Sequence, residues 1–238
     1  MKSSDSSLTT GGRIYQEIRR AIILGHCQPG TRLSVEGLRE QYGTSITPVR
    51  EALQMLSQEG LVTAKPHSGF FVTQITLKQL RDMLELREIL EVASVERAST
   101  RITDKQLAEL ETVHAGYTGE DDEARDRYMV ENRRFHYLIA QASGNQELAD
   151  TLARLHDRLA PFLVVVHPGD EMERIHRRLI EALRTRDRAL ARQTILDEVN
   201  ETQQVTLEHV VQADGGYWHV STLPGQRYEP PQKESETA

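Results

Sequence analysis

Three polar side chains at the start of one short segment have the chemistry to bind DNA. Ser45 and Thr47 carry hydroxyl groups and Arg50 carries a guanidinium group, all within residues 44–53. These groups bond to phosphate oxygens, and arginine also binds the edge of guanine. Ser45 and Thr47 are suited to cap a helix, and Pro48 suits its first turn, where a missing N–H costs nothing. The pattern predicts a helix that presents these groups at its N-terminus.

The elements needed to position this helix are indicated on both sides of it. A short helix is expected over residues 35–42, followed by a turn at Gly43. In the next helix Val49, Leu53 and Leu56 recur at helical spacing and predict a buried face. Two helices joined by a glycine turn form a helix-turn-helix, whose second helix enters the DNA major groove.

A β-hairpin is expected directly after this helix pair. The β-prone runs 61–64 and 70–73 flank a turn with proline and glycine, which is typical of a hairpin. The hairpin predicts the wing of a winged helix-turn-helix. The candidate DNA-binding residues are Arg39, Ser45, Thr47, Arg50, Lys65, His67 and Gly69.

Motifs in this region resemble the DNA-binding domain of GntR-family transcriptional regulators over roughly residues 12–74. The motifs are Leu-Gly at 24–25, Gln-Pro-Gly-Thr-Arg-Leu at 28–33, Ser-Ile-Thr-Pro-Val-Arg-Glu-Ala-Leu at 45–53, Glu-Gly-Leu-Val at 59–62 and Gly-Phe-Phe-Val at 69–72. One position departs from the family pattern, because Ile46 stands where the family usually has a DNA-contacting arginine. The resemblance therefore implies DNA binding, but it does not imply the family's usual operator sequence.

Charge is distributed unevenly along the 238 residues. The whole chain has a formal net charge of −7, yet residues 1–74 carry +2 and the remainder carries −9. A mildly basic first domain on an acidic second domain suits a specific DNA binder with a separate regulatory domain. Because the basic excess is small, we expect tight binding to need two copies, as in a homodimer.

The composition favours a helical cytoplasmic protein. We find no apolar run of 18 residues and no signal peptide pattern, so neither a membrane span nor a membrane partner is expected. The single cysteine, Cys27, cannot form an intramolecular disulfide, which fits a reducing compartment. We expect a mainly α fold: residues 1–8 disordered, a winged helix-turn-helix with a small hairpin wing over 9–74, an all-α antiparallel bundle over 75–212 that binds effector and dimerises, and a flexible tail over 213–238.

One further helix is expected in the first domain, over residues 12–24. Six helices are expected within the bundle, over residues 77–100, 104–118, 122–143, 145–166, 169–185 and 187–211. The apolar stripe of the long helix is expected to include Leu80, Leu84, Arg87, Ile89, Leu90 and Val95.

The second domain resembles the FadR-type effector domain of GntR regulators, also called the FCD domain. The resemblance lies in Glu-Leu-Arg at 85–87 with Leu-Glu at 90–91, in Phe-His at 135–136, and in His176 with Leu-Ile-Glu-Ala-Leu at 179–183. The family commonly binds a divalent metal through an aspartate, a histidine four residues later and two further histidines. This resemblance implies a set of Asn132, His136, His176 and Glu198, with Asp197 as the alternative to Glu198.

Two of these four positions depart from the family, which has Asp and His where this chain has Asn132 and Glu198. Two imidazoles and one carboxylate can still hold zinc, nickel or manganese, whereas an amide oxygen is a poor ligand. The alternative is that the site has lost its metal. The family also implies that Arg87 faces a small carboxylate effector, and the alternative is a salt bridge. His114, His156, His209 and His219 are expected to be surface or satisfied core residues.

The function expected from these patterns is a ligand-responsive transcriptional regulator. It would bind a pseudo-palindromic DNA operator as a dimer, act as a repressor, and sense a small organic acid. Two alternatives remain: a metal-responsive regulator in which the ion is the signal, and a metal-dependent enzyme. No nucleophile or separate general base accompanies the histidines, so we expect no enzymatic activity.

Overall fold

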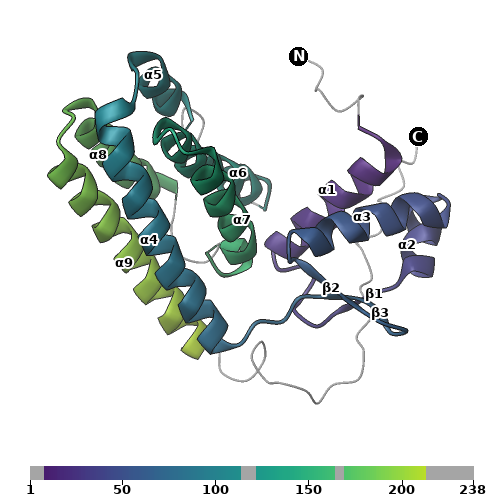
Figure 1. Cartoon of the computed structure of the whole chain (residues 1–238). Coiled ribbons are helices and arrows are strands. Elements are labelled where there is room, and N and C mark those ends of the chain that lie inside the picture. Colours follow the sequence, from purple (N-terminus) through teal and green to yellow (C-terminus); the bar gives the residue numbers. More distant parts are fainter. Residues whose placement is uncertain (1–7, 114–121, 164–168, 213–238) are drawn as a thin grey trace. The chain divides into compact units, whose positions relative to one another are not determined.

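The computed structural model describes residues 8–113, 122–163 and 169–212. The chain divides into two compact units between Gln74 and Ile75 (Figure 1). The first contains α1 (Thr10–Ile23), β1 (Arg32–Leu33), α2 (Val35–Tyr42), α3 (Ile46–Gln58), β2 (Val62–Lys65) and β3 (Gly69–Val72). The second contains α4 (Leu77–Arg101), α5 (Asp104–Thr112), α6 (Asp122–Ala142), α7 (Gln146–Leu163), α8 (Gly169–Arg184) and α9 (Arg188–Gln212).

The first unit is a winged helix-turn-helix, as expected. Helix α3 buries Val49, Leu53 and Leu56 in one core that also includes residues of α1, α2 and the strands. Strands β2 and β3 form the expected hairpin. The hairpin is only part of the sheet, because β1 pairs antiparallel with β3 and gives the strand order β1-β3-β2. The prediction missed β1 because two residues are too few to show an alternating pattern.

The turn between α2 and α3 depends on a glycine. Helix α2 begins at the cap residue Ser34, whose Oγ accepts a hydrogen bond from the Gly37 amide. It ends at Gly43, which has a left-handed backbone with φ of 59°. Its amide and that of Thr44 donate to carbonyls of the last turn of α2, as in a glycine-terminated helix. Gly43 therefore sets the direction in which the chain enters α3.

The second unit is a bundle arranged around α4. Thr76 and Gln79 form a reciprocal capping box at the start of α4. Helix α4 packs against α9, α6, α7 and α8, while α5 packs on α8 and α6, and Figure 1 shows α4 and α9 running side by side. The main core draws Val95, Leu110, Phe135, Leu179 and Ile195 from five of these helices. None of the described helices has the length and apolar character needed to cross a membrane.

The mainly α fold expected from the sequence is confirmed, with local differences. Ile89 is 57% exposed, so its place in the apolar stripe of α4 was wrong. The buried face of α4 instead includes Met83 and Val92. Helix α5 ends at Thr112, and residues 114–118 of the expected longer helix lie outside the described residues. So do residues 1–7 and 213–238, on which disorder and a flexible tail were expected.

Substitution by alanine should change the free energy of unfolding in opposite directions at Gly43, which ends α2, and at Gly37, which lies inside it. Gly43→Ala should lower the free energy of unfolding by about 1 kcal/mol, because a Cβ disfavours the left-handed backbone even in open space. Gly37→Ala should raise it by roughly 0.5–1 kcal/mol, because Gly37 is helical and an added Cβ makes only ordinary contacts. Thermal denaturation of the two variants checks this, and a shift of the same sign in both would contradict it.

Candidate functional site

The exposed start of α3 carries the polar groups expected to bind DNA. Ser45, Thr47 and Arg50 are all exposed. Ser45 occupies the N-cap position, but its hydroxyl makes no capping hydrogen bond, contrary to the expected capping role. Thr47 lies inside the first turn and is not a cap. Among the described residues Arg50 has no hydrogen-bond or ion-pair partner, so its guanidinium is available to a ligand.

The other candidate DNA-binding residues differ in whether their side chains already contact another residue. Arg39 lies in the last turn of α2, and its guanidinium pairs with Glu36 at 3.0 Å and with Glu40 at 3.4 Å. At the tip of the wing, Lys65 places its Nζ 4.7 Å from the centre of the Phe71 ring. His67 and Gly69 both have positive φ, at 59° and 100°, and shape the turn. The tip of the wing is thus exposed to solvent, whereas the guanidinium of Arg39 is already paired with two glutamates of α2.

In the second unit, five helices bring ionisable side chains into one buried cluster. Helix α4 contributes Arg87 and Glu91, which lie one turn apart on the same face. Helix α6 contributes Asn132 and His136 with the same spacing. The cluster is completed by His156 of α7, His176 of α8 and Glu198 of α9, and all seven side chains are buried.

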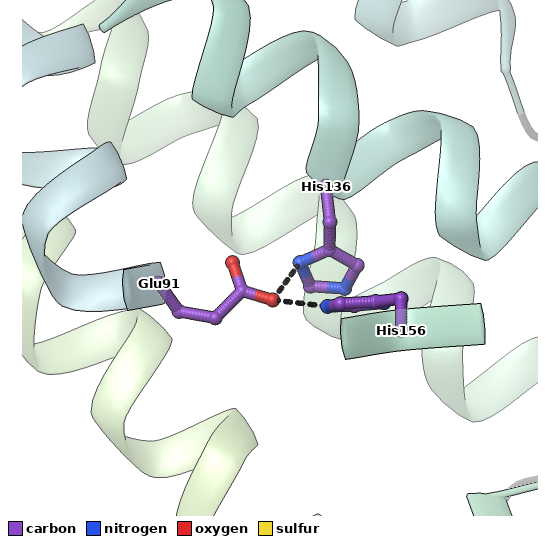
Figure 2. A group of neighbouring side chains, drawn as sticks. All are labelled: Glu91, His136 and His156. Carbon is purple, nitrogen blue, oxygen red and sulfur yellow. Dashed lines mark hydrogen bonds and ion pairs between the residues drawn. The ribbon is translucent and has the colours of Figure 1, made fainter. Parts of the chain in front are cut away.

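Glu91 links two of the histidines (Figure 2). Its Oε1 lies 2.8 Å from Nε2 of His156, within a hydrogen bond, and 3.0 Å from Nδ1 of His136. Figure 2 shows the carboxylate of α4 pointing between the two rings, which come from α6 and α7. Glu91 thereby holds His136 with its Nδ1 turned towards α4.

The opposite nitrogen of His136 faces Glu198. Nε2 of His136 lies 3.2 Å from Oε1 of Glu198, and Nε2 of His176 lies 3.8 Å from the same oxygen. The ring of His176 stacks on Phe135 with centroids 3.8 Å apart, which fixes its orientation. Asp197 is exposed and accepts a hydrogen bond from Gln193, so the structure places Glu198 and not Asp197 at the cluster.

Arg87 lies between the two carboxylates. Its Nε is 3.7 Å from Oε1 of Glu91, and its Nη2 is 3.6 Å from Oε1 of Glu198. The salt-bridge alternative for Arg87 is therefore observed. Yet Nε and Nη1 of Arg87, both oxygens of Glu198 and Oδ1 of Asn132 are buried and make no hydrogen bond with any described residue. Buried polar atoms normally find partners, so these atoms could accept hydrogen bonds from a bound group or donate them to it.

Burial and charge push the pKa values of the cluster apart. Burial opposes protonation of His136, but the charges of Glu91 and Glu198 outweigh it and raise its pKa to about 9. Burial lowers the pKa of His156 to about 4 and lowers that of His176 as well. Burial also opposes ionisation of Glu91 and Glu198, but His136 outweighs it and holds both carboxyl pKa values well below their usual range.

Two overlapping groups in the cluster have donor sets suited to a cation. His136, His176 and Glu198 form one, and Glu91, His136 and His156 form the other, each with ligand atoms within 4.8 Å of one another. The structure thus brings together His136, His176 and Glu198 of the predicted set, and Asn132 is buried one turn before His136 on α6. Sequence reasoning missed Glu91 and His156 as members of the cluster. His156 is a satisfied core histidine, as expected, and His209 is exposed; His114 and His219 lie outside the described residues.

Comparison with known proteins identifies the class to which this architecture belongs. The family described as "Bacterial regulatory proteins, gntR family" matches residues 10–72, and the FCD domain matches residues 82–200. The transcriptional repressor RspR of Escherichia coli is 31% identical over 183 residues, covering 74% of this chain and 79% of RspR. The regulator YdhC of Bacillus subtilis is 28% identical over 84% of this chain and 92% of its own length.

Solved structures agree on the fold. The structure of E. coli McbR/YncC gives a TM-score of 0.69 at 24% identity and covers 85% of this chain and 99% of that one. A GntR regulator from Rhodococcus sp. RHA1 gives 0.63 at 20% identity, covering 83% and 97%. The two family matches and the repressor relative show that the protein is a DNA-binding transcriptional regulator with an FCD domain, and this family is one of regulators rather than enzymes. It belongs to the GntR family.

Two arginines of the helix-turn-helix should differ in their effect on DNA binding. Arg50→Ala should weaken binding to all duplexes by about tenfold or more, because an exposed arginine without a protein partner loses a phosphate or base contact. Arg39→Ala, a matched control, should cost less, because Glu36 and Glu40 already neutralise its charge. Fluorescence anisotropy at one fixed salt concentration measures both. An unchanged affinity in Arg50→Ala would show that α3 does not face DNA.

The buried cluster should also make the stability of the metal-free protein depend on pH. The pKa of His136 is raised from 6.5 to about 9, so its contribution is complete below pH 6.5 and is lost as the pH rises through about 9. We expect the free energy of unfolding to fall by roughly 1–3 kcal/mol across that window. Thermal denaturation of chelator-treated protein would detect this fall. His136→Gln should flatten it, and a fall of equal size in that variant would assign the titration to another group.

Proposed function

We propose that the protein represses transcription in the cytoplasm as a homodimer that releases a pseudo-palindromic operator when its helical domain binds a small carboxylate. Two copies of the winged helix-turn-helix would place two α3 helices in successive major grooves. A dimer is supported by the net charge of only +2 on residues 1–74, because phosphate binding strengthens with each added positive charge.

The observation that carries the effector proposal is the charge balance of the buried cluster. Glu91 and Glu198 bring two negative charges and Arg87 brings one positive charge. Without a metal, protonated His136 supplies the second positive charge. A histidine that ligates a metal is neutral, and with neutral imidazoles the cluster has one excess negative charge, which is costly inside a protein. A divalent cation would leave one excess positive charge instead, and the carboxylate of an organic acid would then neutralise it. The charges thus favour a cation together with an anionic effector.

The donor geometry supports the cation. Tetrahedral bonds of about 2.0–2.1 Å place ligand atoms roughly 3.3 Å apart. The distances of 3.2 and 3.8 Å from Oε1 of Glu198 to His136 and His176 are close to that spacing. We propose that His136, His176 and Glu198 hold zinc, nickel or manganese, with the amide oxygen of Asn132 as a weaker fourth donor. The bound ion would supply Lewis-acid attraction for a carboxylate.

The remaining residues of the cluster then have separate tasks. Oε1 of Glu91 lies 3.0 Å from Nδ1 of His136 and would orient the ring so that Nε2 is directed at the site, as carboxylates do behind many ligating histidines. Arg87 is placed to bind the effector carboxylate through the guanidinium atoms that lack hydrogen bonds. Because α4, α6, α7, α8 and α9 all contribute to the cluster, an effector that draws these side chains inward would shift the helices and change operator affinity.

A metal-responsive regulator is the second candidate, and it is favoured by one observation. The ion pair of Arg87 with both carboxylates is complete without any organic acid. If the ion is itself the signal, metal alone should change operator affinity in the absence of an organic ligand. If the carboxylate is the signal, metal alone should leave the affinity unchanged.

His136→Ala tests the proposal because His136 belongs to both donor groups. The variant should bind the operator with unchanged affinity but should lose release by carboxylates, because its sensing site is disrupted while the winged helix-turn-helix is intact. Anisotropy with the operator and a panel of metal-loaded organic acids would measure this. His209→Ala, an exposed histidine on α9, is the matched control. Normal release in His136→Ala would place the sensing site elsewhere.

A further inference from the structure

The first residue of α3 is an exposed isoleucine that lies outside the core cluster. Ile46 is 40% exposed, and it is absent from the core cluster that Val49, Leu53 and other residues of α3 join. Among the described residues of the first unit, the large apolar side chains with comparable exposure are Leu8 and Met55. Leu8 precedes α1, and Met55 lies towards the other end of α3.

A single exposed apolar side chain is ordinary on a protein surface. Ile46 differs because of its position among the groups expected to bind DNA. Ser45 and Thr47, its neighbours, are exposed, and Arg50 follows one turn later, displaced by about 40° around the helix axis. The N-terminal residues of the second helix are those that contact base edges in a helix-turn-helix. Ile46 therefore lies on the part of α3 that is brought to the bases.

The chemistry of isoleucine restricts what it can recognise there. It carries no hydrogen-bond donor or acceptor, so it cannot bind the polar edges of guanine, adenine or cytosine. The apolar group that base pairs present in the major groove is the C5-methyl of thymine. The branch at Cβ also restricts the side chain to few rotamers, so little freedom is lost on contact.

We propose that Ile46 is a specificity-determining residue that packs on the C5-methyl of one thymine in each operator half-site. Ser45 and Arg50 supply the polar contacts around it, and Ile46 selects thymine over cytosine at the base it covers. The proposal rests on DNA binding through α3, but it adds the identity of one base pair and the atom that is read.

Deoxyuridine provides a test that removes only the methyl group. An operator would first be selected from a random duplex library with the full chain, and each thymine would then be replaced by deoxyuridine, symmetrically in both half-sites. One position should lose affinity by about fourfold per half-site, the factor expected for one buried carbon. In Ile46→Ala the thymine and deoxyuridine duplexes should bind equally well at that position.

Two control variants test whether the effect of the thymine methyl depends on Ile46 itself. Met55→Ala removes an exposed apolar side chain from the same helix and should keep the full methyl effect. Ile46→Arg should shift the base preference at that position from thymine towards guanine, because arginine binds its O6 and N7. Ile46 is outside the core, so the variants should fold, and equal thermal denaturation curves would confirm it.

The outcomes distinguish Ile46 from α3 as a whole. A methyl effect that is absent at every thymine, or that persists in Ile46→Ala, overturns the assignment of Ile46. If Arg50→Ala still lowers affinity in that case, DNA binding through α3 stands and only the thymine contact is wrong. If Arg50→Ala has no effect either, α3 does not face DNA, and both inferences fail together.

Discussion

The second unit depends on compensation of charge inside its helical bundle. Two carboxylates, Glu91 and Glu198, are buried where water cannot solvate them, and Arg87 lies between them at 3.6–3.7 Å. Each ion would be costly to bury alone, so the cluster is stable only as a set. Removing Arg87 would leave both carboxylates without their guanidinium partner at the centre of five packed helices. This mutual dependence means that whatever binds the cluster also affects how the helices pack.

The need to compensate buried charge also explains why the bundle can contain a regulatory site. A bundle core filled only with apolar residues has no means of responding to a small anion. This core keeps polar atoms without hydrogen bonds, on Arg87, Asn132 and Glu198, and those atoms gain partners only when something binds. The first unit differs from the second, because its core is apolar and its candidate DNA-binding groups lie on the surface of α3 and the wing.

Much of this arrangement could be predicted from sequence, for identifiable reasons. The capped and glycine-terminated helices follow from local signals at Ser34, Gly43 and Thr76. The pair Asn132 and His136 is implied by the resemblance to the FCD domain, and a spacing of four residues places both on one helix face. The choice between Glu198 and its neighbour Asp197 could not be made, because one residue of alignment decides whether a side chain of α9 is buried or exposed. Ile89 was misplaced because an apolar residue type does not by itself determine the buried face of a helix.

Other members of the cluster left weaker signals. Glu91 follows Arg87 by four residues, so an ion pair on one face of α4 could have been expected. His156 lies among Leu152, Leu155 and Leu159 on the buried face of α7, which marks it as a buried polar group. That both meet His136 follows from tertiary packing alone. Strand β1 likewise exists because its partner β3 is present, and no local pattern in two residues could reveal it.

The central claim is that the buried cluster holds a divalent cation, and the most direct test is elemental analysis of the full chain purified without chelator. We expect about one zinc, nickel or manganese ion per chain, which should be lost in Glu198→Gln while the protein stays folded. A chain that carries no metal, and takes up none when titrated with each of these ions, would contradict the proposed cation site. Arg87 and protonated His136 would then be the groups that balance the two carboxylates.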